Sequence, residues 1–441
     1  MDIVTRARVR NGISLRGTEF RRLATRSREV LLLAAVVGAG TGLAVAGFES
    51  IVTKGVEWVD RIPLWIAAIM PLVGLSIAAA SLRWIGPSAS PATADEYLLA
   101  FHDHDHHHDL TLRPLIARII AGVATLGSGA PMGLEGPSLY MGSSFGDIIQ
   151  RRLPRAFTPE RRRLLLVAGA AAGVAAIFKA PATGAVFALE VPYQDDLARR
   201  MLLPALVASA SGYLTFVAIH GTAALLTVKG TPPFTFKDLA AAAALGLIAG
   251  IGARVFAWML RTAKHVAADT SVWVRVPAAG ASLAGIFCLA RLVSGENLTT
   301  GPGYATIAWA VDPTRGLWVI VAILVLRCIA TSATVAGGGV GGLFIPLVVA
   351  GALAGRIVGG MANALDTTLF TIVGAAAFLG AGYRVPLAAV VFVAEATGRP
   401  GFIVPGLIAA VVAELIMGRS SVTAYQHAAT DEELDTSRGR N

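Results

Sequence analysis

The sequence predicts an all-α, polytopic membrane protein built from two repeated halves. Of its 441 residues, 55% are hydrophobic and 15% are charged, and the mean hydropathy is +0.66. This composition is far too apolar for an ordinary soluble domain. Several apolar stretches exceed the roughly 20 residues that a helix needs to cross a bilayer. The long apolar stretches, which include these, begin near Val30, Leu64, Leu164, Met201, Leu239, Leu317 and Phe402. Other stretches are short or interrupted by Gly and Pro, so some helices should break within the membrane.

Two sequence elements occur twice, in the same order. The segment GLEGP (133–137) returns as GLFIP (342–346), with glycines following both copies at the same offset of 209 residues. The segment FKAPATGAVFALE (178–190) returns as YRVPLAAVVFVAE (383–395) at an offset of 205 residues. Duplication of this kind is typical of transporter folds. The letters leave open whether the two halves are parallel or inverted.

Composition divides the chain into one membrane domain and two tails. Residues 1–29 hold eight arginines and no small-residue cleavage site, so we expect a basic cytoplasmic tail rather than a removable signal. The membrane domain spans 30–418, with halves at about 30–220 and 235–418, and a short polar tail spans 419–441. The net charge of +9 comes from arginines beside apolar segments, which favours positive-inside topology over nucleic-acid binding. Cys288 and Cys328 lack the spacing of a disulfide framework or a zinc site.

The repeated glycine-rich segments predict a site for an anion. Each places glycines and a proline in apolar sequence, where the helix must break, and such breaks occur at membrane depth only when they are buried or line a cavity. A helix that restarts near Pro137 would point free amides and the positive end of its dipole into that cavity. The second copy would add the amides of Leu343 and Phe344. Because neither segment has the GK[ST] ending of a phosphate-binding loop, a nucleotide is not expected.

Glu135 is the carboxylate that we expect to act. A charged side chain at the bilayer centre costs roughly 2.5–3.5 kcal/mol and is a functional candidate by default. Glu190 and Glu395 recur in both halves, which suits a shared structural task such as capping helix ends, whereas the counterpart of Glu135 is Phe344. The Glu135 carboxylate could occupy the anion site and leave it on protonation, which predicts a gate that responds to acid.

The histidine-rich run 102–109 admits two interpretations. Its imidazoles could bind a metal or sense pH, although such tracts are compositional signals and we expect a solvated loop. The imidazoles are those of His102, His104, His106, His107 and His108. A metal transporter is therefore the alternative outside anion transport, but the other histidines are scattered. No protease motif is present, so we expect neither an enzyme nor a cofactor.

These segments resemble the CLC family of chloride channels and chloride/proton antiporters, from about Val30 to Gly418. GLEGPSLYMG resembles the family's GREGPxxxxG segment with Leu134 in place of the basic residue, and GGLFIP resembles its GxFxP segment. The resemblance implies two inverted repeats with broken and re-entrant helices, and a homodimer with one pore per subunit. It also implies that Glu135 is the external gate and that amides around Leu134 to Gly136 and Leu343 to Phe344 bind chloride.

Three positions depart from the family pattern. The serine of the family's GSGxP motif is best matched by Ser88 within GPSASP (86–91), in imperfect register. The pore tyrosine near the C-terminus has no clean counterpart, and Tyr425 lies two or three residues late. The inner proton-relaying glutamate of the antiporters is Val191 here, directly after Glu190. Since valine cannot carry a proton, the sequence favours a passive or voltage-gated chloride channel.

The alternative is a chloride/proton antiporter with a non-standard inner proton route, through water, Glu190 or the histidine loop. Anion selectivity among chloride, fluoride, nitrate and bromide stays open. We expect chloride as the bound ligand, with lipid, a second copy of the chain and protons as further partners. The absence of regulatory domains resembles prokaryotic members, so we expect a bacterial inner membrane with the N-terminus in the cytoplasm.

Overall fold

The computed structural model describes residues 3–87, 89–103, 110–153, 163–226, 234–362 and 367–428, with side chains from Arg28 onward. This part of the chain is helical, with isolated β-bridges in place of strands. The first half contains α1 (Ile3–Arg61), α2 (Leu64–Ala67), α3 (Met70–Trp84), α4 (Thr93–His102), α5 (Leu112–Gly127), α6 (Glu135–Arg152), α7 (Leu164–Phe178), α8 (Pro181–Glu190), η2 (Arg199–Met201) and α9 (Leu202–His220).

The second half repeats the pattern of long spans and short, broken helices. It contains α10 (Phe236–Asp269), α11 (Val272–Ser294), α12 (Tyr304–Ala310), α13 (Leu317–Ala336), α14 (Phe344–Met361), α15 (Thr368–Tyr383), α16 (Pro386–Thr397), η3 (Pro400–Phe402) and α17 (Ile403–Met417). Eight helical segments in the described ranges are long and apolar enough to cross a membrane. The protein is therefore an integral membrane protein. The first helix runs without a break through residue 29, where the sequence predicted the end of a tail.

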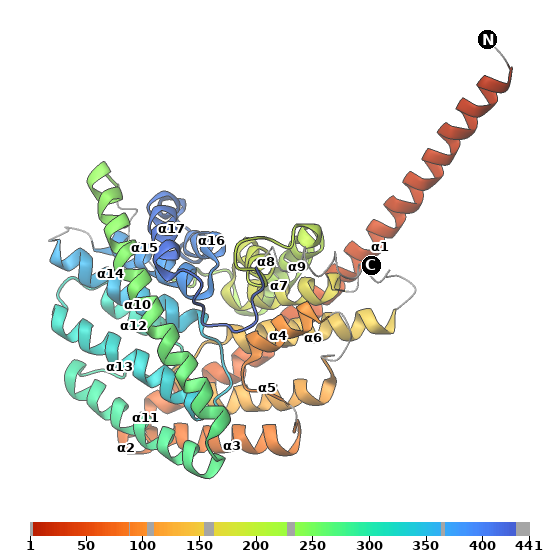
Figure 1. The fold of residues 1–441 in the computed structure, drawn as a ribbon. Helices are drawn as coiled ribbons and strands as arrows, with labels where there is room; N and C mark the ends of the chain where they lie inside the picture. Colours follow the sequence, from red (N-terminus) through yellow and green to blue (C-terminus); the bar gives the residue numbers. More distant parts are fainter. Residues whose placement is uncertain are drawn as a thin grey trace.

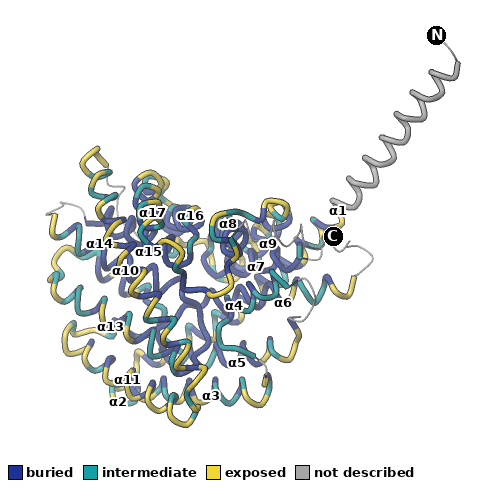
Figure 2. Tube along the Cα trace, in the orientation of Figure 1, coloured by how far each residue is buried: buried dark blue, intermediate teal, exposed yellow. Residues whose placement is uncertain are grey.

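Short apolar helices occupy the centre of the molecule. Every residue of α7 and of α15 is buried, and both are apolar on all sides, as expected for helices covered by protein rather than by lipid. Longer helices such as α10, α11 and α13 lie around them with exposed outer faces (Figures 1 and 2). The broken elements thus form a core that the spanning helices shield from the bilayer.

The two halves are inverted relative to each other. Gly133 and Gly342, at equivalent positions of the two glycine-rich breaks, pair through an antiparallel bridge. The helices α8 and α16 lie side by side (Figure 1), and each caps the other, because Glu190 near the end of α8 binds the first turn of α16 and Glu395 near the end of α16 binds the first turn of α8. Each of these two equivalent helices has its C-terminal end beside the N-terminal end of the other, so the two run antiparallel. This settles the orientation that the letters left open.

Repeated glycines let the core helices approach closely. A Cβ atom on Gly142 of α6 would lie 2.0 Å from the carbonyl oxygen of Gly169 on α7, and one on Gly351 of α14 would lie 2.3 Å from that of Gly374 on α15. Small residues at helix contacts are typical of membrane proteins, where close packing replaces the hydrophobic effect between helices. The glycines that recur at the offset of 209 residues therefore position α6 and α14, whose first turns form the site described next.

The segment 419–428 follows α17 and packs against the protein, although the sequence predicted a polar tail from residue 419. The Gln426 side-chain amide donates to the carbonyl oxygens of Val191 and Tyr383, and Lys264 donates to that of Val422. We call the side of the molecule that carries this segment and the connection 191–201 the C-terminal face. The segment closes part of that face beside α8 and α15.

Candidate anion site

The two glycine-rich breaks place the first turns of α6 and α14 against each other. Gly133 donates its amide to Gly342 over 2.9 Å, and Gly342 donates back over 2.7 Å. Directly after these glycines the chain enters α6 at Glu135 and α14 at Phe344. Each helix begins with amides that have no partner within the helix, and its dipole places partial positive charge at that end. The breaks therefore create a buried, electropositive pocket of backbone amides.

The Glu135 carboxylate occupies this pocket. Its Oε1 atom accepts a hydrogen bond of 2.6 Å from the Phe344 amide. A Cβ atom on Gly133 or Gly342 would lie 1.9 or 2.0 Å from the carboxylate oxygens, so only glycine leaves room for it. The side chain is 4% exposed, and its Oε2 atom has no hydrogen-bond partner among the described residues. The carboxylate thus occupies a buried pocket of backbone amides, which are donors that suit a small anion.

The other residues predicted for the site frame this pocket. Leu134 and Leu343 are the residues that precede α6 and α14, and both are buried. The Gly136 amide lies 2.6 Å from the position that a Cβ atom on Gly342 would take. The predicted donor Phe344 is the residue whose amide binds Glu135. The structure thus brings together the backbone groups that the two repeated motifs singled out.

Two hydroxyl groups beside the pocket were not predicted. Thr93, the first residue of α4, is 1% exposed, and its hydroxyl oxygen lies 2.5 Å from the position of a Cβ atom on Gly136. That hydroxyl has no hydrogen-bond partner among the described residues. Tyr383 is 2% exposed, its ring centroid lies 6.4 Å from that of Phe344, and it lines a cavity together with Gly342 and Leu343. Tyr383 begins the second copy of a repeated motif, and its counterpart Phe178 carries no hydroxyl. A comparison of the two copies could therefore have identified Tyr383 from sequence.

The two hydroxyl residues expected from the family pattern are placed differently. Ser88 lies outside the described residues. Tyr425 is 42% exposed and lines a cavity of about 430 Å³ that opens at the C-terminal face. Gly342, Leu343, Thr93 and Tyr383 line the same cavity at its inner end. The cavity thus reaches the amide pocket from the C-terminal face, with Tyr425 on its wall and Tyr383 beside the pocket.

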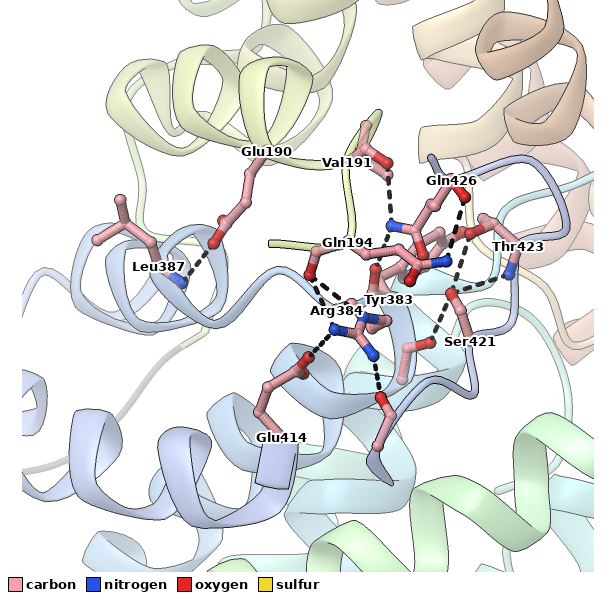
Figure 3. Close-up of polar contacts among 12 residues, drawn as sticks. Glu190, Val191, Gln194, Tyr383, Arg384, Leu387, Glu414, Ser421, Thr423 and Gln426 are labelled. Atoms are coloured by element: carbon pink, nitrogen blue, oxygen red, sulfur yellow. Dashed lines mark hydrogen bonds and ion pairs between the residues drawn. The ribbon is translucent and has the colours of Figure 1, made fainter. Parts of the chain in front are cut away.

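The carboxylate next to Val191 has a structural task. Both oxygens of Glu190 accept backbone hydrogen bonds at the start of α16, 3.0 Å from the Leu387 nitrogen and 2.7 Å from the Ala388 nitrogen. Figure 3 shows this side chain turned toward Leu387, away from Val191 and Gln426. Glu395 binds the first turn of α8 in the same way, with a third bond of 2.6 Å from the Thr183 hydroxyl. The capping role suggested by the repeat is therefore present in both halves.

Val191 itself is 1% exposed, and its carbonyl oxygen accepts a bond of 2.9 Å from the Gln426 side chain. On the same face, Arg384 pairs with Glu414 at 3.3 Å and donates to the carbonyl oxygens of Gln194 and Gly418 (Figure 3). Arg384 and its counterpart Lys179 end α15 and α7 with positive φ angles of 58° and 53°. The surroundings of Val191 are thus filled by backbone bonds and an ion pair.

Of the histidine-rich run 102–109, the structure describes residues 102 and 103. His102 ends α4, and its Nε2 atom lies 2.9 Å from the Pro192 carbonyl oxygen. Its ring stacks on that of His427 with the centroids 3.8 Å apart. His104, His106, His107 and His108 lie outside the described residues. Where the chain is described, no group of three or more His, Cys, Asp or Glu side chains is placed to hold a metal ion.

Comparisons with known proteins assign the family. Residues 73–418 match the sequence model of the family described as voltage gated chloride channel. The chain is 28% identical over 431 residues to the H⁺/Cl⁻ exchange transporter ClcA of Vibrio parahaemolyticus, covering 90% of this chain and 89% of the relative. It is 27% identical over 444 residues to ClcA of Klebsiella pneumoniae, covering 91% and 89%.

Solved structures share the fold. A CLC-type fluoride/proton antiporter superposes with a TM-score of 0.78 at 21% identity, covering 91% of this chain and 98% of that chain. A slow cyanobacterial Cl⁻/H⁺ antiporter superposes with a TM-score of 0.74 at 22% identity, covering 88% and 94%. With the family match spanning most of the membrane domain, the chain belongs to the CLC family of voltage-gated chloride channel proteins.

Proposed function

We propose that this protein exchanges chloride for protons across the membrane. The sequence favoured a passive channel because Val191 replaces the inner carboxylate. The named relatives are H⁺/Cl⁻ exchange transporters, and the two similar structures are those of antiporters, which supports the alternative of coupled exchange. Coupled exchange is therefore favoured over the passive channel that the sequence predicted.

The observation that carries the proposal is the position of the Glu135 carboxylate on the Phe344 amide. An anion that enters this pocket competes with the carboxylate for the same donors. Protonation removes the charge of Glu135 and replaces a charge-assisted hydrogen bond with a weaker neutral one. A proton thereby promotes release of the side chain, and an anion takes its place. One carboxylate can in this way link the movements of the two ions.

We further propose that the protein lies in a bacterial inner membrane as a homodimer, with its N-terminus in the cytoplasm. The arginines before the first membrane span support this orientation, because positive residues favour the cytoplasmic side. We propose that the C-terminal face is cytoplasmic as well. The cavity at this face would then admit anions and protons from the cytosol.

The test is flux from proteoliposomes that contain the purified protein. A chloride gradient is imposed at clamped voltage, and external chloride and internal pH are recorded together. Exchange predicts proton movement against the proton gradient at a constant ratio to chloride. Chloride flux without proton movement would refute exchange and support the passive channel. Repeating the measurement with fluoride identifies the preferred anion, and Glu57→Gln, an exposed carboxylate on α1, serves as the control variant.

A further inference from the structure

An exchanger of this kind must deliver protons from the C-terminal face to Glu135, and the structure shows why position 191 does not supply them. Val191 has no titratable group. The adjacent Glu190 carboxylate is held by two amides of α16, and Glu414 is paired with Arg384. Moving either carboxylate would break a helix cap or an ion pair. The proton donor to Glu135 is therefore better sought where water can reach the pocket.

The cavity at the C-terminal face offers that access. It has a volume of about 430 Å³ and is lined at its inner end by Leu343 and by Gly342, against which the Glu135 carboxylate lies. Water needs only about 30 Å³ per molecule, so the cavity is large enough for several waters. Asp95, on the first turn of α4, lies on its wall and is 6% exposed. A titratable carboxylate thus shares a cavity with the inner side of the pocket.

Asp95 is held in place by groups from two other segments. Its Oδ2 atom accepts a bond of 2.6 Å from Lys264 of α10, and its Oδ1 atom accepts one of 3.3 Å from the Ala424 amide. Tyr383 lines the same cavity as Asp95, together with Gly342 and Leu343. The hydroxyl of Thr93, two residues before Asp95, has no partner among the described residues. The hydroxyls of Thr93 and Tyr383, which can donate and accept hydrogen bonds, therefore line the same cavity as Asp95.

The other charged groups around the cavity leave Asp95 as the carboxylate suited to this task. Both carboxylates on the walls are paired, Glu96 with Arg118 at 3.0 Å and Asp95 with Lys264 at 2.6 Å. Arg118 is 2% exposed and does not line the cavity, whereas Lys264 does, so an anion in the cavity can replace Asp95 as the counter-charge of Lys264. The remaining ionisable groups on the walls are the basic side chains Arg261, Lys264, His265 and Arg275 and the phenols of Tyr383 and Tyr425. The excess of basic groups favours entry of anions into the same cavity.

We propose that Asp95 takes up protons at the C-terminal face and passes them through the cavity to Glu135, so that anion and proton share one access route. The inference rests on the proposed exchange function. The proton binds the Asp95 carboxylate and then moves through cavity water and hydroxyls to the Glu135 carboxylate. Asp95 becomes an anion again, Glu135 becomes neutral, and no other reactant is consumed.

The pair with Lys264 offers a reason for the two ions to move together. Protonation of Asp95 leaves the Lys264 ammonium without its counter-charge. A chloride ion in the cavity compensates that charge, so the anion favours uptake of the proton by Asp95. By linkage, protonation of Asp95 favours binding of the anion to the same extent. Binding of the anion and binding of the proton in the cavity would thus favour each other.

The experiment is simultaneous chloride and proton flux for Asp95→Asn, which keeps the shape and the acceptor oxygen but cannot take up a proton. We expect the proton-to-chloride ratio to fall at least tenfold while chloride flux persists. Glu96→Gln, the neighbouring carboxylate of the same cavity, is the matched control and should keep the wild-type ratio. Asp95→Glu should restore proton transport, which a purely structural role of the carboxylate would not require.

The outcomes separate the inference from the function on which it rests. Wild-type protein that moves no protons refutes exchange itself. Wild-type protein that exchanges, with the same ratio for Asp95→Asn, overturns the role of Asp95 alone. If Asp95→Asn does not fold, Lys264→Gln supplies the test, because it keeps Asp95 but removes the cation that chloride would compensate when Asp95 is protonated. The chloride concentration that gives half-maximal proton flux should then rise, and an unchanged value would overturn the inference.

Discussion

Replacing Glu135 with alanine removes the side chain that competes with an anion for the amide pocket. In the structure its carboxylate accepts a short hydrogen bond of 2.6 Å from the Phe344 amide. A hydrogen bond to a charged group contributes about 1.5–3 kcal/mol, and the short distance favours the upper value. Ordering the glutamate side chain offsets about 1–2 kcal/mol of this. With about 3 kcal/mol for the bond and about 1.5 kcal/mol for ordering, the net advantage of the closed position is about 1.5 kcal/mol.

An anion must overcome this advantage before it can bind. Because 1.4 kcal/mol corresponds to a factor of ten, Glu135→Ala should strengthen apparent chloride binding about tenfold. Glu135→Gln keeps the shape but loses the charge, so its effect should lie between those of wild type and alanine. Isothermal titration of detergent-purified protein with chloride measures the three affinities, with Glu57→Gln as the control for a lost surface charge.

The same variants should uncouple transport. Glu135→Ala and Glu135→Gln are expected to conduct chloride without proton movement and without dependence on pH. Chloride affinity within twofold of wild type for Glu135→Ala would show that the carboxylate does not compete at this pocket. Chloride flux that still responds to acid in both variants would remove Glu135 from the gate.

Three further predictions concern the structure around the pocket. Glu395→Gln keeps one strong acceptor for three donors at the start of α8, so it should destabilise the protein by about 1–3 kcal/mol, visible as a lower melting temperature, while folded protein still transports. Gly351→Ala forces a Cβ atom to 2.3 Å from a carbonyl oxygen of α15 and should abolish folding, whereas Gly285→Ala meets open space; equal yields of folded protein would contradict this packing argument. Thr93→Val removes only the buried hydroxyl and should weaken chloride binding about fivefold, by about 1 kcal/mol, whereas Thr93→Ser should restore it; equal affinities would exclude the hydroxyl from the site.

Much of the site could be predicted from local sequence. Glycines and a proline inside apolar stretches mark helix breaks wherever they occur, because the bilayer tolerates unpaired backbone only in protein or at a cavity. Aligning the two repeats distinguished Glu135, whose counterpart in the second repeat is Phe344, from Glu190 and Glu395, which are counterparts of each other. The structure places the first on the amides of α14 and the other two on helix ends.

The prediction of the hydroxyl groups was less complete. Thr93 and Tyr383 reach the pocket from α4 and α15, which are separated by most of the chain, and the family pattern directed attention to Ser88 and Tyr425 instead. A hydroxyl residue in a turn or at a helix end looks the same in sequence whether or not it faces a cavity. Its partner groups are set by how α4, α10 and α15 pack.

The sequence alone established a membrane protein of two repeated halves, the two helix breaks and the one unmatched carboxylate. These features depend on composition and short-range spacing, which govern insertion into a bilayer and the start of each helix. Only the tertiary structure decided that the halves are inverted, that α8 and α16 cap each other, and that Asp95 shares a cavity with the inner side of the amide pocket. Those relations join residues far apart in the chain, and close packing of the folded helices is what brings them into contact.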